Sequence, residues 1–247
     1  MTRVGRSVFA RHMTALAHAG WRTLTLDEFR KPRTTHDARR TFLLSFDDGY
    51  ASLVEHAYPV LADLGFTATT FLITDYVGRT NTWDVQYTWR RLKHLTWPEI
   101  EHWRARGFDF ASHSATHQRL TWLDDAAIET ELRGSREALT SRLGAETGRA
   151  IAYPFGAVNR RVVQFARQAG YALGFGGVRG NGDPLLISRI PVYFWDTGDV
   201  PFGLRNGGIG SLGRTLAHLA NRCAVGTTLM QSFTRKSAPL PESVADA

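Results

Sequence analysis

The stretch Thr41-Phe42-Leu43-Leu44-Ser45-Phe46-Asp47-Asp48-Gly49 joins a run of apolar and β-favouring side chains to an abruptly acidic end. Such a run is typical of a strand buried on both faces of a parallel sheet. Two carboxylates at the end of a buried strand are costly to desolvate unless a partner uses them. An Asp-Gly turn is the simpler interpretation of the same residues, and the rest of the chain has to decide between the two.

The overall composition is that of a soluble globular protein. The chain has 247 residues, of which 43% are hydrophobic and 21% charged, and its formal net charge is +7. This length suits one large α/β domain. The basic residues do not form a run and no zinc-finger, helix-turn-helix or RNA-binding pattern accompanies them, so no nucleic acid partner is expected. Cys223 is the only cysteine, which excludes a disulfide framework and a cysteine-based metal site.

No window of the sequence is long and apolar enough to predict a membrane span. The N-terminal residues lack the uninterrupted apolar segment of a signal peptide. As written, the sequence therefore predicts a cytoplasmic protein, and a segment upstream of Met1 would change this expectation to an extracytoplasmic location. The sequence does not indicate the oligomeric state.

Helical and strand patterns alternate along most of the chain. Strands are expected over 41–46, 67–73, 108–111, 150–153, 171–175, 187–192 and 227–233, with helices over 53–64, 97–106, 124–143, 159–169 and 211–220 among them. This alternation is typical of parallel βαβ units, in a barrel or in a doubly wound sheet. In either fold, functional residues gather where the strands end. We expect a single domain over residues 1–236 and a disordered tail over 237–247.

Two further expected strand ends carry unusual residues. Ser112-His113-Ser114-Ala115-Thr116-His117 places two imidazoles four residues apart, which on one helical turn would bring them close enough to hold one metal ion. Ala152-Tyr153-Pro154-Phe155-Gly156 ends a strand in a Pro-aromatic-Gly turn. A histidine pair of this spacing often occurs by chance, but two histidines and one aspartate form a known ligand set for catalytic zinc. A second aspartate beside the ligand then has a task as a base for water.

In their order along the chain, Phe46-Asp47-Asp48-Gly49, His113-Ser114-x-x-His117 and Tyr153-Pro154-Phe155-Gly156 resemble the first three motifs of the NodB-type polysaccharide deacetylases, carbohydrate esterase family 4, in their Tyr-Pro-Phe-Gly form. The resemblance covers roughly residues 7–195. It implies an α/β fold, namely a distorted, incomplete (β/α) barrel of about seven parallel strands. It also implies metal-dependent hydrolysis of the N-acetyl group of an amino sugar, with release of acetate.

The resemblance also implies roles for individual residues. Asp48, His113 and His117 would hold a divalent metal ion, for which zinc is favoured and cobalt, nickel and manganese are alternatives. Asp47 would be the general base that deprotonates the attacking water, and the backbone N–H of Phe155 would help to hold the tetrahedral oxyanion. The implied partner is an N-acetylated saccharide, which could be a polysaccharide, an oligosaccharide or a small glycoside.

The sequence departs from the family pattern at two positions. Ala152 stands where the family often has an arginine that pairs with the catalytic aspartate, and we hypothesise that Arg189 reaches Asp47 from a later strand instead. Gln231 stands where a histidine would be the general acid, and glutamine does not donate a proton at neutral pH. His218 follows a suitable leucine but lies in a helix pattern, so the proton donor is not identified.

Other aromatic residues and histidines have ordinary structural interpretations. Four histidines are expected at the surface or in helices: His36, His56, His94 and His102. Trp83, Trp122, Tyr193 and Trp195 could stack on sugar rings, although the packing of loops on the barrel explains them equally well.

Two alternative functions remain open at this point. One is a metal-independent amidohydrolase acting on a small amide on the same barrel, which the complete set of Asp48, His113 and His117 disfavours. The other is a non-catalytic carbohydrate-binding protein, which Gln231 suggests. Metal content and acetate release would separate the three functions.

Overall fold

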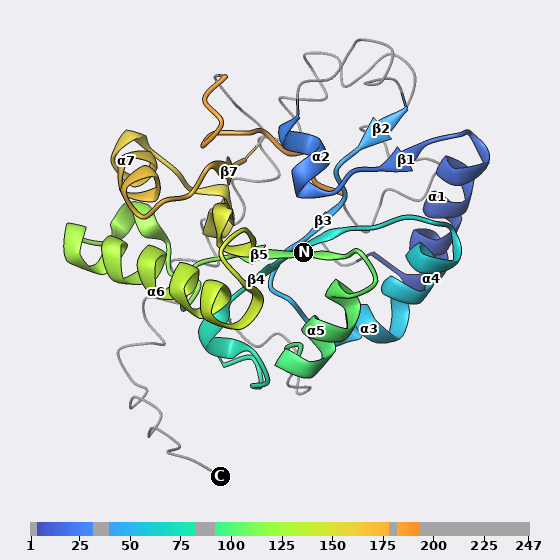
Figure 1. Ribbon diagram of the computed structural model, residues 1–247, viewed down its shortest axis with the longest axis horizontal. Helices are drawn as coiled ribbons and strands as arrows, with labels where there is room; N and C mark the ends of the chain where they lie inside the picture. Colours follow the sequence, from blue (N-terminus) through green and yellow to red (C-terminus); the bar gives the residue numbers. More distant parts are fainter. Residues whose placement is uncertain (1–3, 32–39, 83–91, 178–181, 193–247) are drawn as a thin grey trace.

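Parallel strands form the centre of the computed structural model, which describes residues 4–31, 40–82, 92–177 and 182–192 (Figure 1). Strands β1 (Arg22–Thr23) and β2 (Thr41–Phe42) form a short sheet. The main sheet follows the order of the chain and consists of β3 (Ser45–Phe46), β4 (Thr69–Leu72), β5 (Asp109–Ser112), β6 (Ala150–Ala152) and β7 (Leu173–Phe175). Every neighbouring pair of these strands is parallel.

Helices connect the strands of the main sheet. Those of the described residues are α1 (Arg6–His18), α2 (Leu26–Arg30), α3 (Ser52–His56), α4 (Tyr58–Asp63), α5 (Trp97–Arg104), α6 (Asp125–Leu143) and α7 (Arg160–Gln168), with short 3₁₀ turns η1 (Thr74–Tyr76), η2 (Leu120–Trp122), η3 (Thr147–Arg149) and η4 (Pro154–Gly156). Figure 1 shows α1, α3, α4 and α5 around one part of the sheet and α6 and α7 around the other. Among these helices, none has the length and apolar character needed to cross a membrane.

The two edges of the main sheet approach each other. A bridge between Phe175 and Ile187 continues the sheet beyond β7 by one more parallel segment. Arg189, in that segment, contacts Asp47 at the end of β3, which is the opposite edge. Contact between the first and last edges requires a curled sheet, so the fold is the incomplete (β/α) barrel that the sequence predicts.

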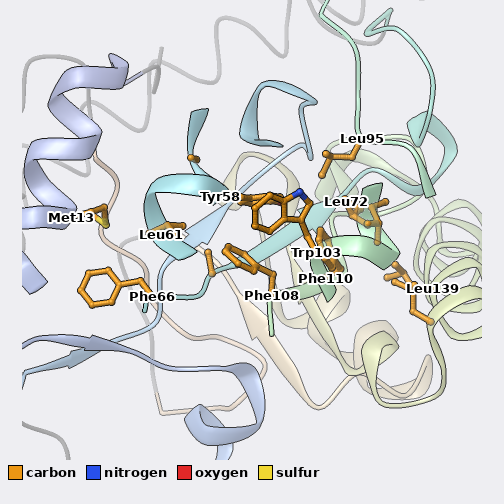
Figure 2. Packing of buried hydrophobic residues seen from close by; sticks show 14 of the residues in the cluster. Met13, Tyr58, Leu61, Phe66, Leu72, Leu95, Trp103, Phe108, Phe110 and Leu139 are labelled. Carbon is orange, nitrogen blue, oxygen red and sulfur yellow. The ribbon is translucent and has the colours of Figure 1, made fainter. Parts of the chain in front are cut away.

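Side chains alternate between the inside and the outside of this curled sheet. The inner cluster contains Phe71, Ala111, Ala150, Ala152, Leu173 and Phe175. Its small residues lie on β5 and β6, while the rings of Phe71 and Phe175 approach to 5.3 Å. On the outside, Tyr58 packs at 4.7 Å from Phe108 and at 5.1 Å from Trp103, under the helices (Figure 2). The core is therefore formed on both faces of the sheet and fixes the positions of the strand ends.

Several elements differ from the sequence prediction. The strand expected over 41–46 is divided into β2 and β3, which belong to different sheets. The helix expected over 53–64 is divided into α3 and α4 beside Pro59, because proline has no N–H to continue the helical hydrogen bonds. In the segment expected to be a strand over 187–192, only Ile187 forms a bridge. The helix over 211–220, the strand over 227–233 and the tail over 237–247 lie outside the described residues.

Candidate active site

The two adjacent aspartates lie where β3 ends. Asp48 has φ +69° and Gly49 has φ +67°, so the chain turns sharply through two left-handed residues. Left-handed backbone costs a non-glycine residue about 1–2 kcal/mol, although aspartate tolerates it better than most. A Cβ at Gly49 would lie 2.6 Å from Leu72 Cδ2, so the turn also needs a glycine for space. The turn directs the two neighbouring carboxylates to different partners.

The histidine pair lies in a loop that follows β5. The sequence predicts one helical turn here, but Ser114 and His117 have φ +65° and +60°, which no helix contains. The loop is held by its own side chains: the His117 N–H donates to Ser114 Oγ and the Ser114 N–H donates to Ser112 Oγ, each at 3.1 Å. The two imidazole rings nevertheless converge to 4.8 Å. The expected helical turn is therefore wrong, while the expected proximity of the rings is present.

Both imidazoles are buried, and His113 has a defined tautomer. Its Nδ1–H donates to the Ala152 carbonyl at 2.7 Å, which leaves Nε2 as the ligand atom. Burial lowers the pKa of the His113 imidazole, against the opposing effect of the nearby Asp47 carboxylate. A neutral imidazole with Nε2 unprotonated is the form that binds a metal ion.

Asp48, His113 and His117 form a compact set of donor atoms. Asp48 Oδ1 lies 3.5 Å from Nε2 of each histidine, and the three donors lie within 4.8 Å of one another. Two ligand atoms that each lie about 2.1 Å from one zinc ion, at a tetrahedral angle, are roughly 3.4 Å apart. In the part of the chain that the structure describes, no other group of histidine, cysteine and acidic residues has this arrangement. The set thus fits a divalent cation.

Asp47 faces the same site but has a different partner. Both of its carboxylate oxygens accept hydrogen bonds from the Arg189 guanidinium, at 2.6 and 2.9 Å. Its Oδ2 lies 3.9 Å from His113 Nε2. Desolvation by the surrounding atoms would raise the pKa of Asp47, whose side chain is 38% exposed, but the Arg189 guanidinium and the neighbouring histidines hold it well below its usual value. Asp47 is therefore an ionised carboxylate beside the donor set.

Arg189 is itself held in place. Its guanidinium lies 5.5 Å from the centre of the Phe71 ring and within 3.4 Å of Ser45 Oγ. The structure thus places Arg189 against Asp47 from the opposite edge of the sheet. Ala152, which the family pattern associates with an arginine, instead contributes its carbonyl oxygen to His113.

Phe155 lies in the turn that follows β6, with φ +61°. Its ring packs at 4.6 Å against that of His117, so this turn adjoins the donor set. The neighbouring Tyr153 fixes the turn, because its buried hydroxyl donates to the Leu185 carbonyl at 3.0 Å. Among the described residues, no oxygen accepts a hydrogen bond from the Phe155 N–H. This amide can accordingly serve a ligand.

The remaining sequence candidates have varied locations. Trp122 is 51% exposed, and the Arg119 guanidinium lies 5.1 Å from its ring centre. His94, expected at the surface or in a helix, is 3% exposed and contacts the Asp48 backbone. Outside the described residues lie Trp83, Tyr193, Trp195, His218, Gln231, His36 and Cys223.

Two buried residues near the site had no signal in the sequence. They are His94 and Glu131, which contact the loops of Asp48 and His117 respectively. Neither belongs to a motif, and each is separated in sequence from the loop that it contacts. Only long-range packing reveals them.

Known proteins are similar to this chain over the segment that contains Asp47, the histidine pair and Phe155. The family model described as polysaccharide deacetylase matches residues 34–174. The Bacillus subtilis protein YxkH is 28% identical over 179 residues, which are 70% of this chain and 58% of that protein. The poly-beta-1,6-N-acetyl-D-glucosamine N-deacetylase of Staphylococcus aureus is 27% identical over 194 residues, which are 76% of this chain and 67% of that protein.

A solved structure supports the fold. A deacetylase from Streptococcus pyogenes, in complex with acetate, superimposes with a TM-score of 0.69 and 24% identity, over 78% of this chain and 84% of that one. At this level of identity the likeness concerns the fold alone. It agrees with the curled parallel sheet described above.

Proposed function

The chain belongs to the polysaccharide deacetylase family, and we propose that it hydrolyses the N-acetyl group of an amino sugar and releases acetate. One observation carries the proposal. An ionised aspartate, held by Arg189, adjoins a three-residue donor set at the carboxyl edge of the barrel. This combination supplies a base for water beside a cation site, which is suited to the hydrolysis of an unactivated amide.

The donor set supports a divalent metal ion as cofactor. Asp48, His113 and His117 would hold it, and two imidazoles with one carboxylate favour zinc, with cobalt, nickel and manganese as alternatives. A bound cation of this kind supplies Lewis acidity to the site. The Ala152 carbonyl keeps the Nε2 atom of His113 available for it.

Asp47 is proposed as the general base. Its carboxylate would accept the proton of the water that attacks the acetamide carbonyl. Arg189 contributes in two ways, because a bidentate hydrogen bond both fixes the orientation of the carboxylate and keeps it ionised. Arg189 touches the base rather than the substrate and is therefore a positioning residue.

The Phe155 N–H is proposed as a donor to the developing oxyanion. Phe155 has a left-handed backbone conformation, and its ring packs directly against the His117 ring. A preorganised amide that faces the point where negative charge develops stabilises the transition state more than the substrate. As the tetrahedral species breaks down, the C–N bond breaks and the nitrogen takes up one proton, which balances the proton that Asp47 accepts from the water, so acetate and a free amine are released.

The proposed substrate is a polymer or oligomer of an N-acetylated amino sugar. The Staphylococcus aureus relative acts, by its name, on poly-beta-1,6-N-acetyl-D-glucosamine. Exposed Trp122, in the segment that follows His117, offers an aromatic face on which a sugar ring could stack.

Acetate release tests the proposal. The purified chain is stripped with a chelator, reloaded with zinc or cobalt, and incubated with N-acetylglucosamine oligomers of β-1,4 and β-1,6 linkage. We expect acetate only after reloading. A chain that binds the metal but releases no acetate from any acetylated sugar would instead be a carbohydrate-binding protein, and release by the stripped chain would indicate the metal-independent reaction.

A further inference from the structure

His94 makes a direct hydrogen bond to a proposed metal ligand. Its Nδ1–H donates to the Asp48 carbonyl oxygen at 2.8 Å, although the two residues are 46 positions apart. We propose that His94 is a positioning residue that fixes the orientation of Asp48 and thereby sets the affinity of the site for its cation. The inference rests on the proposed function, since it assigns a role at the same site.

The backbone around His94 already pairs with the turn that carries Asp48. Tyr50 and His94 form an antiparallel bridge. The Leu95 N–H donates to the Gly49 carbonyl at 2.8 Å, and the Ala51 N–H donates to the Lys93 carbonyl at 2.9 Å. These backbone bonds reach Gly49 but not Asp48. The His94 side chain extends the pairing by one residue, to the position at which the turn is left-handed.

The imidazole of His94 is fixed by its neighbours. Its ring stacks on that of Tyr50, with the centres 4.8 Å apart and the planes at 29°, and the Tyr76 ring lies at 5.7 Å. The Tyr50 hydroxyl accepts a hydrogen bond from Asn81 Nδ2 at 2.7 Å. With 3% of its surface exposed, His94 is shielded from solvent. These contacts surround the ring while its Nδ1–H is directed at the Asp48 carbonyl oxygen.

This bond matters because of the backbone that it holds. Left-handed non-glycine residues persist only where the surroundings determine the conformation. A hydrogen bond to the Asp48 carbonyl fixes the peptide plane between Asp48 and Gly49, and with it the direction of the Asp48 side chain. Without this bond, Asp48 Oδ1 would no longer be held at 3.5 Å from both Nε2 atoms. Groups that orient metal ligands typically contribute a factor of about 10–100 in metal affinity.

Three variants separate positioning from simple packing. Asparagine at position 94 can place its amide nitrogen near the location of Nδ1 and retains the donor. Glutamine has a similar size and polarity but carries its amide farther out, near the location of Nε2, and leucine fills space without a donor. His102, which is exposed on α5, receives the same substitutions as a matched control.

The test measures zinc affinity of the metal-free chain by competition with a chromophoric chelator, together with the absorption spectrum of the cobalt-loaded chain and its thermal midpoint. We expect H94L and H94Q to weaken zinc binding roughly 10–100-fold and to alter the cobalt spectrum. We expect H94N to stay within about threefold of wild type, as the variants at His102 do. H94Q keeps the test decisive if H94L does not fold.

Two results would overturn the inference. One is a folded H94Q or H94L that binds zinc as tightly as wild type. The other is H94N weakened as much as H94Q, which would show that packing rather than the donor matters. Acetate release is measured separately. If the His94 variants weaken zinc binding as expected but the wild-type chain releases no acetate, the proposed function is contradicted and the inference about His94 is not.

Discussion

Two aspartates at opposite ends of the same parallel sheet have opposite ionisation behaviour. Asp47, after β3, has a side chain that is 38% exposed and is held ionised by its bidentate contact with Arg189. Asp109, at the start of β5, receives one hydrogen bond, from the Leu26 N–H at 2.7 Å. Burial raises the pKa of Asp109 to about 6. The guanidinium that contacts both oxygens of Asp47 lies at the carboxyl edge of the barrel, and no arginine makes such a bidentate contact with Asp109 in the described part of the chain.

The backbone shows the same asymmetry between the two ends. Of the five non-glycine residues with positive φ in the described part of the chain, four lie at the site: Asp48, Ser114, His117 and Phe155. Each follows a strand, at the point where the chain must turn to direct a polar group into the site. Concentration of unfavourable conformations at one place is typical of functional sites.

The largest expected effect distinguishes the two ends directly. D48A should lose zinc binding and lower acetate release by at least about three orders of magnitude, since it removes a member of a cooperating set. D109N removes a carboxylate charge at the other end and should keep both properties. Metal content by mass spectrometry and acetate release would be measured for both. Loss of metal in D109N would break the distinction between the ends.

The second prediction concerns the partner of Asp47. In R189M the pKa of Asp47 should rise toward its ordinary value, because the neighbouring cation is gone. A base with a higher pKa is less ionised at low pH, so the acidic limb of the kcat/KM profile should move to higher pH. With a pKa near the ordinary value the carboxylate is still ionised at pH 5, so we expect the pH-dependent loss only below about pH 4, in addition to a pH-independent loss of roughly tenfold from the lost orientation of the base.

R167M is the matched control for this prediction. Arg167 donates to Asp183 at 2.9 Å on the surface, so its loss should leave the pH profile unchanged. Superimposable profiles for R189M and wild type would show that Arg189 does not act on Asp47.

The third prediction concerns the histidine loop. Glu131, 4% exposed on α6, accepts hydrogen bonds from the Thr116 N–H at 2.9 Å and from Gln118 Nε2 at 3.1 Å. E131Q loses one acceptor, so we expect the free energy of unfolding to fall by about 1–3 kcal/mol and zinc affinity to fall roughly tenfold. E129Q, which affects only an exposed pair with Arg133, is the control. Urea denaturation and zinc competition measure the two effects, and equal behaviour of both variants would contradict the role of Glu131.

The smallest expected effect is a pH dependence of stability from Asp109. The ordinary pKa of an aspartate is 3.8, and that of Asp109 in the folded chain is about 6. At a pH between these two values, the folded chain therefore binds more protons than the unfolded chain. The contribution of Asp109 to the free energy of unfolding therefore decreases as the pH rises from 4 to 6. The shift in pKa corresponds to a contribution of roughly 3 kcal/mol to the free energy of unfolding. Because Asp109 is partly exposed, solvent screening reduces this contribution to on the order of 1 kcal/mol.

The variant D109N tests this dependence. Its amide oxygen still accepts from the Leu26 N–H but does not titrate, so the chain should lose this part of the pH dependence. Urea denaturation of the metal-free chain at pH 4, 5 and 6 would measure it. Parallel curves for D109N and wild type would contradict the raised pKa.

The sequence predicts the barrel and the ends of its strands better than the details between them. Strand ends are visible because apolar runs stop at polar motifs, as at Asp47 and His113. The loop of His113 and His117 was expected to be a helical turn, because spacing alone does not reveal that Ser114 and His117 are left-handed. The break in the strand over 41–46 depends on which neighbour each half pairs with, and a local pattern does not contain that information.

The supporting residues were beyond prediction for a related reason. His94 contacts a loop 46 positions away and Glu131 contacts one 15 positions away, and both residue types are common at surfaces. The contact of Arg189 with Asp47 was expected because the family pattern pairs the catalytic aspartate with an arginine and Ala152 stands at that arginine's usual position. A residue that completes a catalytic motif, such as Arg189, can be predicted from the sequence. A residue that only packs against a loop of the site, such as His94, has no pattern in a single sequence by which it could be predicted.

The most direct test of the account compares wild type with D47N at equal zinc content. Acetate release from N-acetylglucosamine oligomers is measured for both, after metal analysis has shown that each chain holds the same amount of zinc. We predict release by wild type and a rate at least about a thousandfold lower for D47N, because the base is lost while the donor set remains. Equal rates for the two chains would contradict the assignment of Asp47 as the base of a metal-dependent deacetylase.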